Sequence, residues 1–259
     1  MSDVTYEVDS DGVAVVTWDL ENRSMNVLNF QSLGEYRQII EKLIGDDAVK
    51  GIVLRSAKDA FIAGADLTSS EVFGFDSVQE DKVKAAEKIY NGNMEMQLLF
   101  RSMETCGKPF VAAINGHALG GGFEICLSCH YRVAIDNDKI QIGQPEAKVG
   151  LIPGAGGTQR LPRIIGLPLA KEMIFTGQKL SGYECLEIGL VNHTEDDHEK
   201  AMEKAMEIAT IIGAEKGPVA IRAAKQAINY GINMDISSAC KLKRLATRKL
   251  CPLKIELKG

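Results

Sequence analysis

Two glutamates stand out because each closes a turn marked by glycine or proline. Glu124 follows the run Gly120-Gly121-Gly122, and Glu146 ends the run Gly143-Gln144-Pro145-Glu146. Two carboxylates on separate turns can converge on one small volume. One of them can then take a proton while the other gives one, as the addition or removal of water requires. The pair therefore predicts general acid–base chemistry.

The triple glycine is predicted to join a strand to a helix. Residues 109–114 form an apolar run typical of a strand, and residues 123–127 suit a buried helix. The first amides of a helix have no internal partner and carry the positive end of the helix dipole. Because glycine has no Cβ, a ligand oxygen can approach such amides closely.

A second backbone donor is expected from residues 61–67, where another apolar segment breaks at Ala63-Gly64-Ala65. Two such amides would hold a developing enolate oxygen, with about 3–4 kcal/mol gained per donor. For one Gly-Gly-Gly run, tight turns and close packing would be the ordinary explanation. A third glycine-rich block, residues 150–160, follows at once. Three such blocks in this order favour a functional site.

Three of these runs together resemble the crotonase, or enoyl-CoA hydratase/isomerase, superfamily. They are Ala63-Gly64-Ala65-Asp66, Gly120-Gly121-Gly122-Phe123-Glu124 and Pro153-Gly154-Ala155-Gly156-Gly157-Thr158-Gln159-Arg160. The resemblance runs from near residue 4 to about residue 235. Residues 104–109 also resemble the hydratase half of multifunctional β-oxidation proteins.

The resemblance implies an α/β fold, with a spiral of ββα units in residues 1–195 and a helical C-terminal region in residues 196–259. It implies that Glu124 and Glu146 are the catalytic carboxylates. The amides of Ala65 and Gly121 would form an oxyanion hole for the thioester carbonyl. Contacts with coenzyme A or substrate are implied for Arg23, Ser24, Met25, Ala63, Asp66, Leu67 and Gly154.

The implied function is a hydro-lyase that adds water reversibly across the 2,3 double bond of enoyl-CoA thioesters, in fatty acid or related acyl-CoA metabolism. Coenzyme A would be part of the substrate, with no other cofactor, and the assembly a homotrimer or dimer of trimers. One alternative is double-bond isomerisation or another reaction of the superfamily. Isomerisation needs a single base, so a carboxylate at Glu124 would be surplus. The other alternative is a non-catalytic acyl-CoA or RNA-binding scaffold.

Length and composition agree with one globular domain that carries a small helical appendage. The chain has 259 residues, of which 45% are hydrophobic. Its net charge of −5 argues against a nucleic-acid-binding surface. The first residues resemble neither a signal nor a transit peptide, and no apolar stretch approaches the roughly 20 residues of a membrane span. We expect a cytoplasmic protein with no membrane or nucleic-acid partner.

Of the four histidines, His130, His193 and His198 show no metal-ligand spacing, and no metal is expected. Of the six cysteines, four show no pairing pattern, namely Cys106, Cys185, Cys240 and Cys251. The run Cys126-Leu127-Ser128-Cys129-His130 matches a haem-attachment pattern literally. Both cysteines lie on the predicted buried helix, where free cysteine is an ordinary small apolar residue. For His117, beside the glycine turn, we expect a structural hydrogen bond.

Alternating strands and helices are predicted along the chain. The motif Ser10-Asp11-Gly12 indicates a hairpin, Ser181-Gly182-Tyr183-Glu184 a helix-opening capping box, and Gly217-Pro218 the start of another helix. The predicted strands are residues 5–9, 13–19, 50–55, 110–114, 131–135 and 139–142, and the predicted helices include residues 30–45 and 77–104.

Residues 240–259 are strongly basic, against an acidic body. Read one nucleotide out of phase, the codons available for residues 242–259 permit the terminal pattern usual in the family. One hypothesis is therefore a frameshifted tail. The other is a genuine basic helix that contacts coenzyme A phosphates. The nucleotide sequence distinguishes the two.

Overall fold

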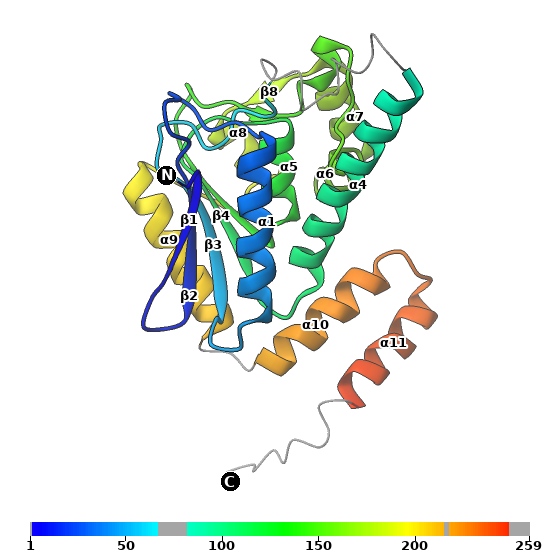
Figure 1. The fold of residues 1–259 in the computed structure, drawn as a ribbon. Helices are drawn as coiled ribbons and strands as arrows, with labels where there is room; N and C mark the ends of the chain where they lie inside the picture. Colours follow the sequence, from blue (N-terminus) through cyan, green and yellow to red (C-terminus); the bar gives the residue numbers. More distant parts are fainter. Residues whose placement is uncertain (1, 67–81, 215–217, 249–259) are drawn as a thin grey trace.

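The computed structural model describes residues 2–66, 82–214 and 218–248 (Figure 1). Its larger sheet has six strands in the order β1-β2-β3-β4-β6-β9. The first pair is antiparallel and every later pair is parallel. The strands are β1 (Val4–Val8), β2 (Val13–Trp18), β3 (Gly51–Ser56), β4 (Phe110–Ile114), β6 (Tyr131–Ile135) and β9 (His193–Glu195).

A smaller sheet lies beside the glycine turn. It consists of β5 (Ala118–Leu119), β7 (Ile142–Gly143) and β8 (Lys179–Leu180), in the order β5-β7-β8. The strand predicted over residues 139–142 is wrong in its bounds. The backbone amide of Lys139 donates to the Asn137 side chain at 2.9 Å, and that of Ile140 to the Asn137 carbonyl at 3.1 Å. These local hydrogen bonds form a turn, so strand β7 begins only at residue 142.

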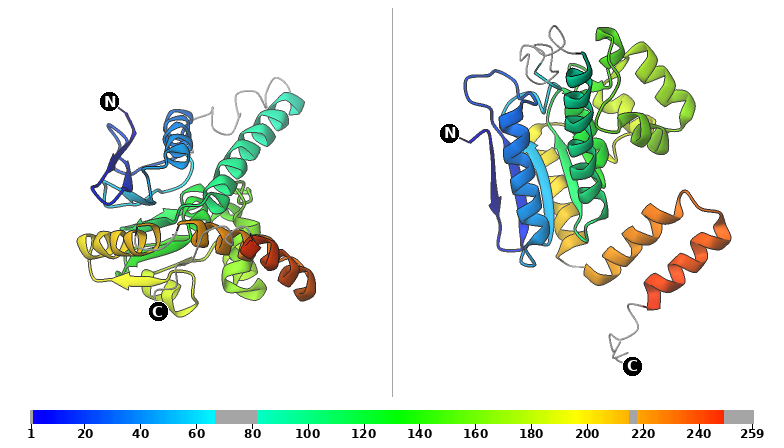
Figure 2. Two further views of the ribbon diagram at one scale, coloured as in Figure 1. Left: turned by 90° about the horizontal axis from the view of Figure 1, so that it is seen from below. Right: turned by 45° about the vertical axis from the view of Figure 1, so that its right-hand side comes forward.

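Helices cover both sides of the larger sheet. Helix α9 packs against β3, β4 and β6, while α1, α4 and α5 lie on the other side (Figures 1 and 2). The helices are α1 (Phe30–Gly45), α4 (Lys82–Thr105), α5 (Gly121–Ser128), α6 (Gly157–Ile165), α7 (Leu167–Thr176), α8 (Gly182–Glu187), α9 (His198–Gly213), α10 (Pro218–Gly231) and α11 (Ile236–Arg248), with a 3₁₀ turn η1 (Glu146–Val149). Of the helix predicted over residues 77–104, residues 77–81 lie outside the described part of the chain.

One apolar core joins the sheet to these helices. Trp18 of β2 and Tyr36 of α1 pack with ring centroids 5.1 Å apart, and both are fully buried. Phe100 of α4, Phe110 of β4 and Phe123 of α5 belong to the same cluster. Burying one such side chain contributes about 1.5–3 kcal/mol. The helices that carry the site are therefore fixed on the sheet by large side chains.

The expected burial of Cys126 and Cys129 and the expected structural hydrogen bond of His117 are confirmed. Cys126 and Cys129 are buried free thiols on and just after α5, and burial raises the pKa of Cys129 to about 12. The Nδ1 atom of His117 accepts a hydrogen bond from the Gln141 amide at 3.0 Å. The capping box at Ser181 is present as predicted.

The C-terminal helices α10 and α11 pack against each other and project from the body (Figure 2). The body contact comes from α10, which touches the end of α4. Apolar side chains on the hairpin are exposed, with Ile228 at 65%, Ile232 at 68% and Ile236 at 78%. Residues 249–259 of the atypical tail lie outside the described residues. None of the described helices is long and apolar enough to span a bilayer.

Candidate active site

Glu124 lies in the first turn of α5 because glycines allow the preceding backbone to turn sharply. Gly120 has φ +53°, a conformation that residues with a Cβ rarely adopt. A Cβ on Gly122 would lie 2.4 Å from the Ile62 carbonyl oxygen, so the two segments approach as only glycine permits. The turn points Glu124 inward, and its side chain is almost fully buried.

One oxygen of Glu124 is held by the backbone of the third glycine block. Oε1 accepts hydrogen bonds from the amides of Ala155 at 2.9 Å and Gly157 at 2.6 Å. Burial raises the pKa of Glu124, whereas these amides and the positive charge of Arg160 act in the opposite direction. Oε2 lies 4.0 Å from where a Cβ on Gly121 would stand. The second oxygen therefore faces the glycine turn.

Glu146 opens η1 directly after Pro145 and reaches the same turn from the other side. Its Oε1 lies 3.3 Å from the position of a Cβ on Gly120. Burial raises the pKa of Glu146 to about 7, and the negative charge of Glu124 adds to that effect. The structure thus brings both glutamates to one turn and gives them unlike surroundings.

Gln144 belongs to this site although sequence reasoning assigned it no role. Its side chain is fully buried. With its amide nitrogen turned toward Glu146, it donates to the two carboxylate oxygens at 2.9 and 3.3 Å. The available signal was its position two residues before Glu146 in the Gly-Gln-Pro-Glu run.

The predicted oxyanion donors follow two backbone segments that run side by side. Ile62 and Ala118 form a parallel bridge, and the Leu119 amide donates to the Ile62 carbonyl at 3.0 Å. Ala65 and Gly121 come shortly after these contacts, so both lie near the glycine turn. Within the described residues, no hydrogen bond occupies the amide of either.

The predicted coenzyme A contacts come together only in part. Arg23 Nη2 and Asp66 Oδ2 are 2.8 Å apart, which links their two loops. Ser24 and Met25 are exposed beside Arg23. The amide of Ala63 is already used, because it donates to the Asn26 carbonyl at 2.9 Å. Leu67 lies outside the described residues.

Gly154 belongs to the loop that holds Glu124. A Cβ there would lie 2.8 Å from Asn93 Oδ1 of α4, and its carbonyl accepts from Gln97 Nε2 at 2.8 Å. The structure therefore places Gly154 against α4, and its expected contact with coenzyme A or substrate stays a prediction.

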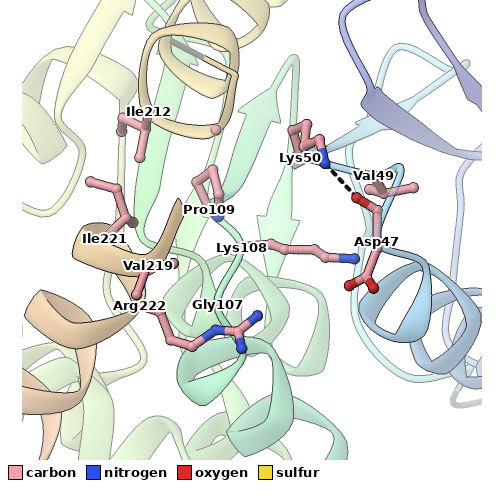
Figure 3. A pocket seen from close by; sticks show the side chains of 11 residues that line it. Asp47, Val49, Lys50, Gly107, Lys108, Pro109, Ile212, Val219, Ile221 and Arg222 are labelled. Carbon is pink, nitrogen blue, oxygen red and sulfur yellow. Dashed lines mark hydrogen bonds between the residues drawn. The ribbon is translucent and has the colours of Figure 1, made fainter. Parts of the chain in front are cut away.

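A cavity of about 240 Å³ lies at the other end of the sheet (Figure 3). Lys50 and Pro109, just before β3 and β4, line it together with Arg222 of α10. Lys108 also lines it, and its Nζ donates to the carbonyls of Leu43 and Asp46, which stabilises the end of α1. None of the predicted site residues lines this cavity.

Comparison with known proteins decides the family. The family described as enoyl-CoA hydratase/isomerase matches residues 9–249. The chain belongs to the enoyl-CoA hydratase/isomerase family. The predicted membership and the predicted α/β crotonase fold are therefore confirmed. No comparison tests the boundary expected near residue 195, which stays a prediction.

Individual relatives of this enoyl-CoA hydratase/isomerase family member agree. A short-chain-enoyl-CoA hydratase of Clostridium acetobutylicum is 41% identical over 88% of this chain and 81% of its own length. The fatty acid oxidation complex subunit alpha of Idiomarina loihiensis is 43% identical over 72% of this chain, which spans only 25% of that relative. An enoyl-CoA hydratase structure from Bacillus anthracis has a TM-score of 0.85 and 33% identity, covering 97% of this chain and 92% of that one.

Proposed function

We propose that this chain adds water reversibly across the 2,3 double bond of an enoyl-CoA thioester, with Glu124 and Glu146 as the acid–base pair. The observation that carries the proposal is the meeting of two buried or half-buried carboxylates at one glycine turn. Their surroundings differ, because two backbone amides hold Glu124 while burial keeps the pKa of Glu146 at about 7. Membership of the enoyl-CoA hydratase/isomerase family supports the same activity.

In the proposed reaction a water molecule binds between the two glutamates. Glu124 accepts a proton from the water as the water oxygen forms its bond to the β carbon. The electrons of the double bond move toward the thioester, and the amides of Ala65 and Gly121 stabilise the enolate oxygen. Glu146 then donates a proton to the α carbon.

The electrostatics support this division of roles. A group with a pKa near 7 is protonated in a substantial fraction of molecules at neutral pH, which suits Glu146 as the acid. Burial raises the pKa of Glu124, and the hydrogen bonds from the two amides oppose that rise by favouring the ionised form that a base needs. Two carboxylates in unlike environments commonly divide the acid and base roles in this way.

The remaining proposals concern substrate, assembly and compartment. The residues that would contact coenzyme A or substrate are Arg23, Ser24, Met25, Ala63, Asp66, Leu67 and Gly154. Coenzyme A enters as part of the substrate, so no other cofactor is proposed. The exposed apolar side chains of the α10–α11 hairpin support assembly into a homotrimer or dimer of trimers. We place the protein in the cytoplasm, without nucleic-acid or membrane partners.

Two measurements on the purified chain test the proposal. Titration with butyryl-CoA, which cannot be hydrated, measures binding, and loss of the conjugated double bond of crotonyl-CoA measures hydration. The proposal predicts binding and hydration together. Binding without turnover would favour the non-catalytic scaffold. Conversion of a 3-enoyl-CoA faster than hydration of crotonyl-CoA would favour the isomerase.

A further inference from the structure

The loop of residues 154–157 is held from both sides. On one side its amides at Ala155 and Gly157 donate to Glu124. On the other side its carbonyls accept from side chains: Gly154 from Gln97 Nε2 and Ala155 from Arg160 Nη1, each at 2.8 Å. In a trans peptide the carbonyl and the following amide point in opposite directions. By fixing the Gly154 carbonyl, Gln97 therefore orients the Ala155 amide toward Glu124. By fixing the Ala155 carbonyl, Arg160 orients the next amide, that of Gly156, which also lowers the pKa of Glu124.

The Arg160 side chain is held in one position by Glu104 and Phe100. Its Nε lies 2.6 Å from Oε1 of Glu104, at the end of α4, and the two side chains are only 13% and 19% exposed. Its guanidinium also lies 5.9 Å from the centroid of the Phe100 ring. A Cβ on Gly156 would lie 2.2 Å from Arg160 Nη1, so the loop backbone rests directly on the guanidinium.

We infer that Arg160, locked by Glu104, is a positioning residue that holds the 154–157 loop against Glu124 and thereby maintains the carboxylate as an ionised, correctly aimed base. The charged groups that face Glu124 are Arg160 from α6 and Glu146 from η1, with Glu104 of α4 behind Arg160. Arg160 acts through its charge and through the loop backbone, because the carbonyl that it binds belongs to the peptide between the two amides that donate to Glu124. Its hydrogen bond to the loop carbonyl also polarises the adjoining peptide.

A purely structural explanation predicts something different. If the pair of Arg160 and Glu104 only ties α6 to α4, its loss lowers stability but leaves the titration of Glu124 unchanged. If Arg160 positions Glu124, its loss raises the pKa of Glu124. Activity, which needs the ionised base, then disappears at a higher pH on the acidic side of the profile. The kinetic readout rests on the proposed hydration.

The test compares Arg160→Met with Arg160→Lys and with the control Arg163→Met. Arg163 lies on the same helix, is exposed, and donates to the Gln159 carbonyl instead. For Arg160→Met we expect kcat on crotonyl-CoA to fall about 10²-fold with little change in KM, because the base is misplaced. The acidic limb of kcat/KM should move to higher pH. Arg160→Lys should recover part of both, and Arg163→Met should behave as wild type.

A second readout needs no turnover. The titration of the Glu124 carboxyl is followed by infrared difference spectroscopy against Glu124→Gln, in the wild type and in Arg160→Met. A shift to higher pH supports the inference even if the wild type proves to be no hydratase. An unchanged titration in a folded variant overturns it, whatever happens to thermal stability. If Arg160→Met does not fold, the titration of Glu124 is followed in Glu104→Gln instead, a variant that keeps a neutral acceptor for Arg160. A shift of that titration to higher pH supports the inference, and an unchanged titration overturns it.

Discussion

The Gly157 amide nitrogen lies 2.6 Å from Oε1 of Glu124, so the first residue of α6 holds a carboxylate in the first turn of α5. The N-terminus of a helix carries partial positive charge, which favours an ionised carboxylate. A Cβ on Gly157 would lie 3.0 Å from the same Glu124 oxygen. Glycine at this position therefore belongs to the site and not only to the turn.

Gly121 is predicted to act through its backbone. In Gly121→Val the new Cβ would lie 2.7 Å from Leu28 Cδ1, so the turn or Leu28 must shift and the amide moves with it. We expect kcat to fall by about 10²–10³-fold, the usual loss for one oxyanion donor. Thermal stability should fall much less. Gly34→Ala, on α1 with nothing within 4 Å of its Cβ, is the control and should keep full activity.

Ala65→Pro removes the second proposed donor outright, because proline has no backbone N–H. We expect hydration to be lost in a variant that still melts cooperatively. Ala65→Gly, which keeps the amide, should retain most of the activity. Equal activity in the proline and glycine variants would show that the Ala65 amide does not hold the thioester oxygen.

Glu146 should make the fold less stable as pH rises. Its folded-state pKa of about 7 lies above the ordinary value of 4.5, so the folded state favours the protonated form. The stabilising contribution of the bound proton is present below pH 4.5 and is lost as pH rises through about 7. Glu146→Gln, which stays neutral, should therefore have a higher Tm than wild type at pH 8.

The difference in Tm between Glu146→Gln and wild type should be smaller at pH 5. Glu203→Gln, which alters an exposed carboxylate of α9, is the control and should change Tm little at either pH. A Tm difference for Glu146→Gln that does not grow between pH 5 and pH 8 would mean that the proton on Glu146 is not linked to folding.

The α10–α11 hairpin is predicted to serve assembly and coenzyme A binding more than chemistry. It reaches the body through contacts such as Asn229 Nδ2, which donates to the Glu104 carbonyl at 2.9 Å. A chain ending at residue 214 should keep its folded core. Light scattering should show weaker assembly, and KM for crotonyl-CoA should rise by a larger factor than kcat falls. A truncated chain with an unchanged oligomeric state would contradict this.

The two hypotheses for the basic tail also predict different assemblies. The chain as it stands is compared with one whose residues 242–259 are replaced by a family-like terminus. A frameshifted tail predicts weak assembly that the replacement restores, together with gained activity. A genuine basic helix predicts a stable, fully active trimer or hexamer in the chain as it stands.

Local signals predicted much of the fold. Helix α1 occupies the predicted residues because its apolar spacing is regular and Asn29 caps it through a capping box with Ser32. Strand β4 also has the predicted bounds, because its apolar run ends at a turn. The strand expected over residues 139–142 failed because a single side chain, Asn137, makes a turn that hydrophobicity does not indicate.

The sequence predicted the motifs of the site but not the side-chain contacts that support its two glutamates. Glycine runs marked the turns that bring Glu124 and Glu146 together. The pair of Arg160 and Glu104 joins residues 56 positions apart, and such a contact leaves no trace in one sequence. Gln144 was visible within its run, but only the fold shows its amide against Glu146.

The most direct test of the central claim is kcat for crotonyl-CoA hydration in Glu124→Gln and Glu146→Gln, measured beside wild type at neutral pH. Both substitutions keep the size of the side chain and remove its ability to exchange a proton. Each should lower kcat by about 10²–10⁴-fold, the range for a positioned acid or base, while butyryl-CoA binds with nearly unchanged affinity. Wild-type kcat in both variants would contradict the assignment of the two glutamates as the acid–base pair.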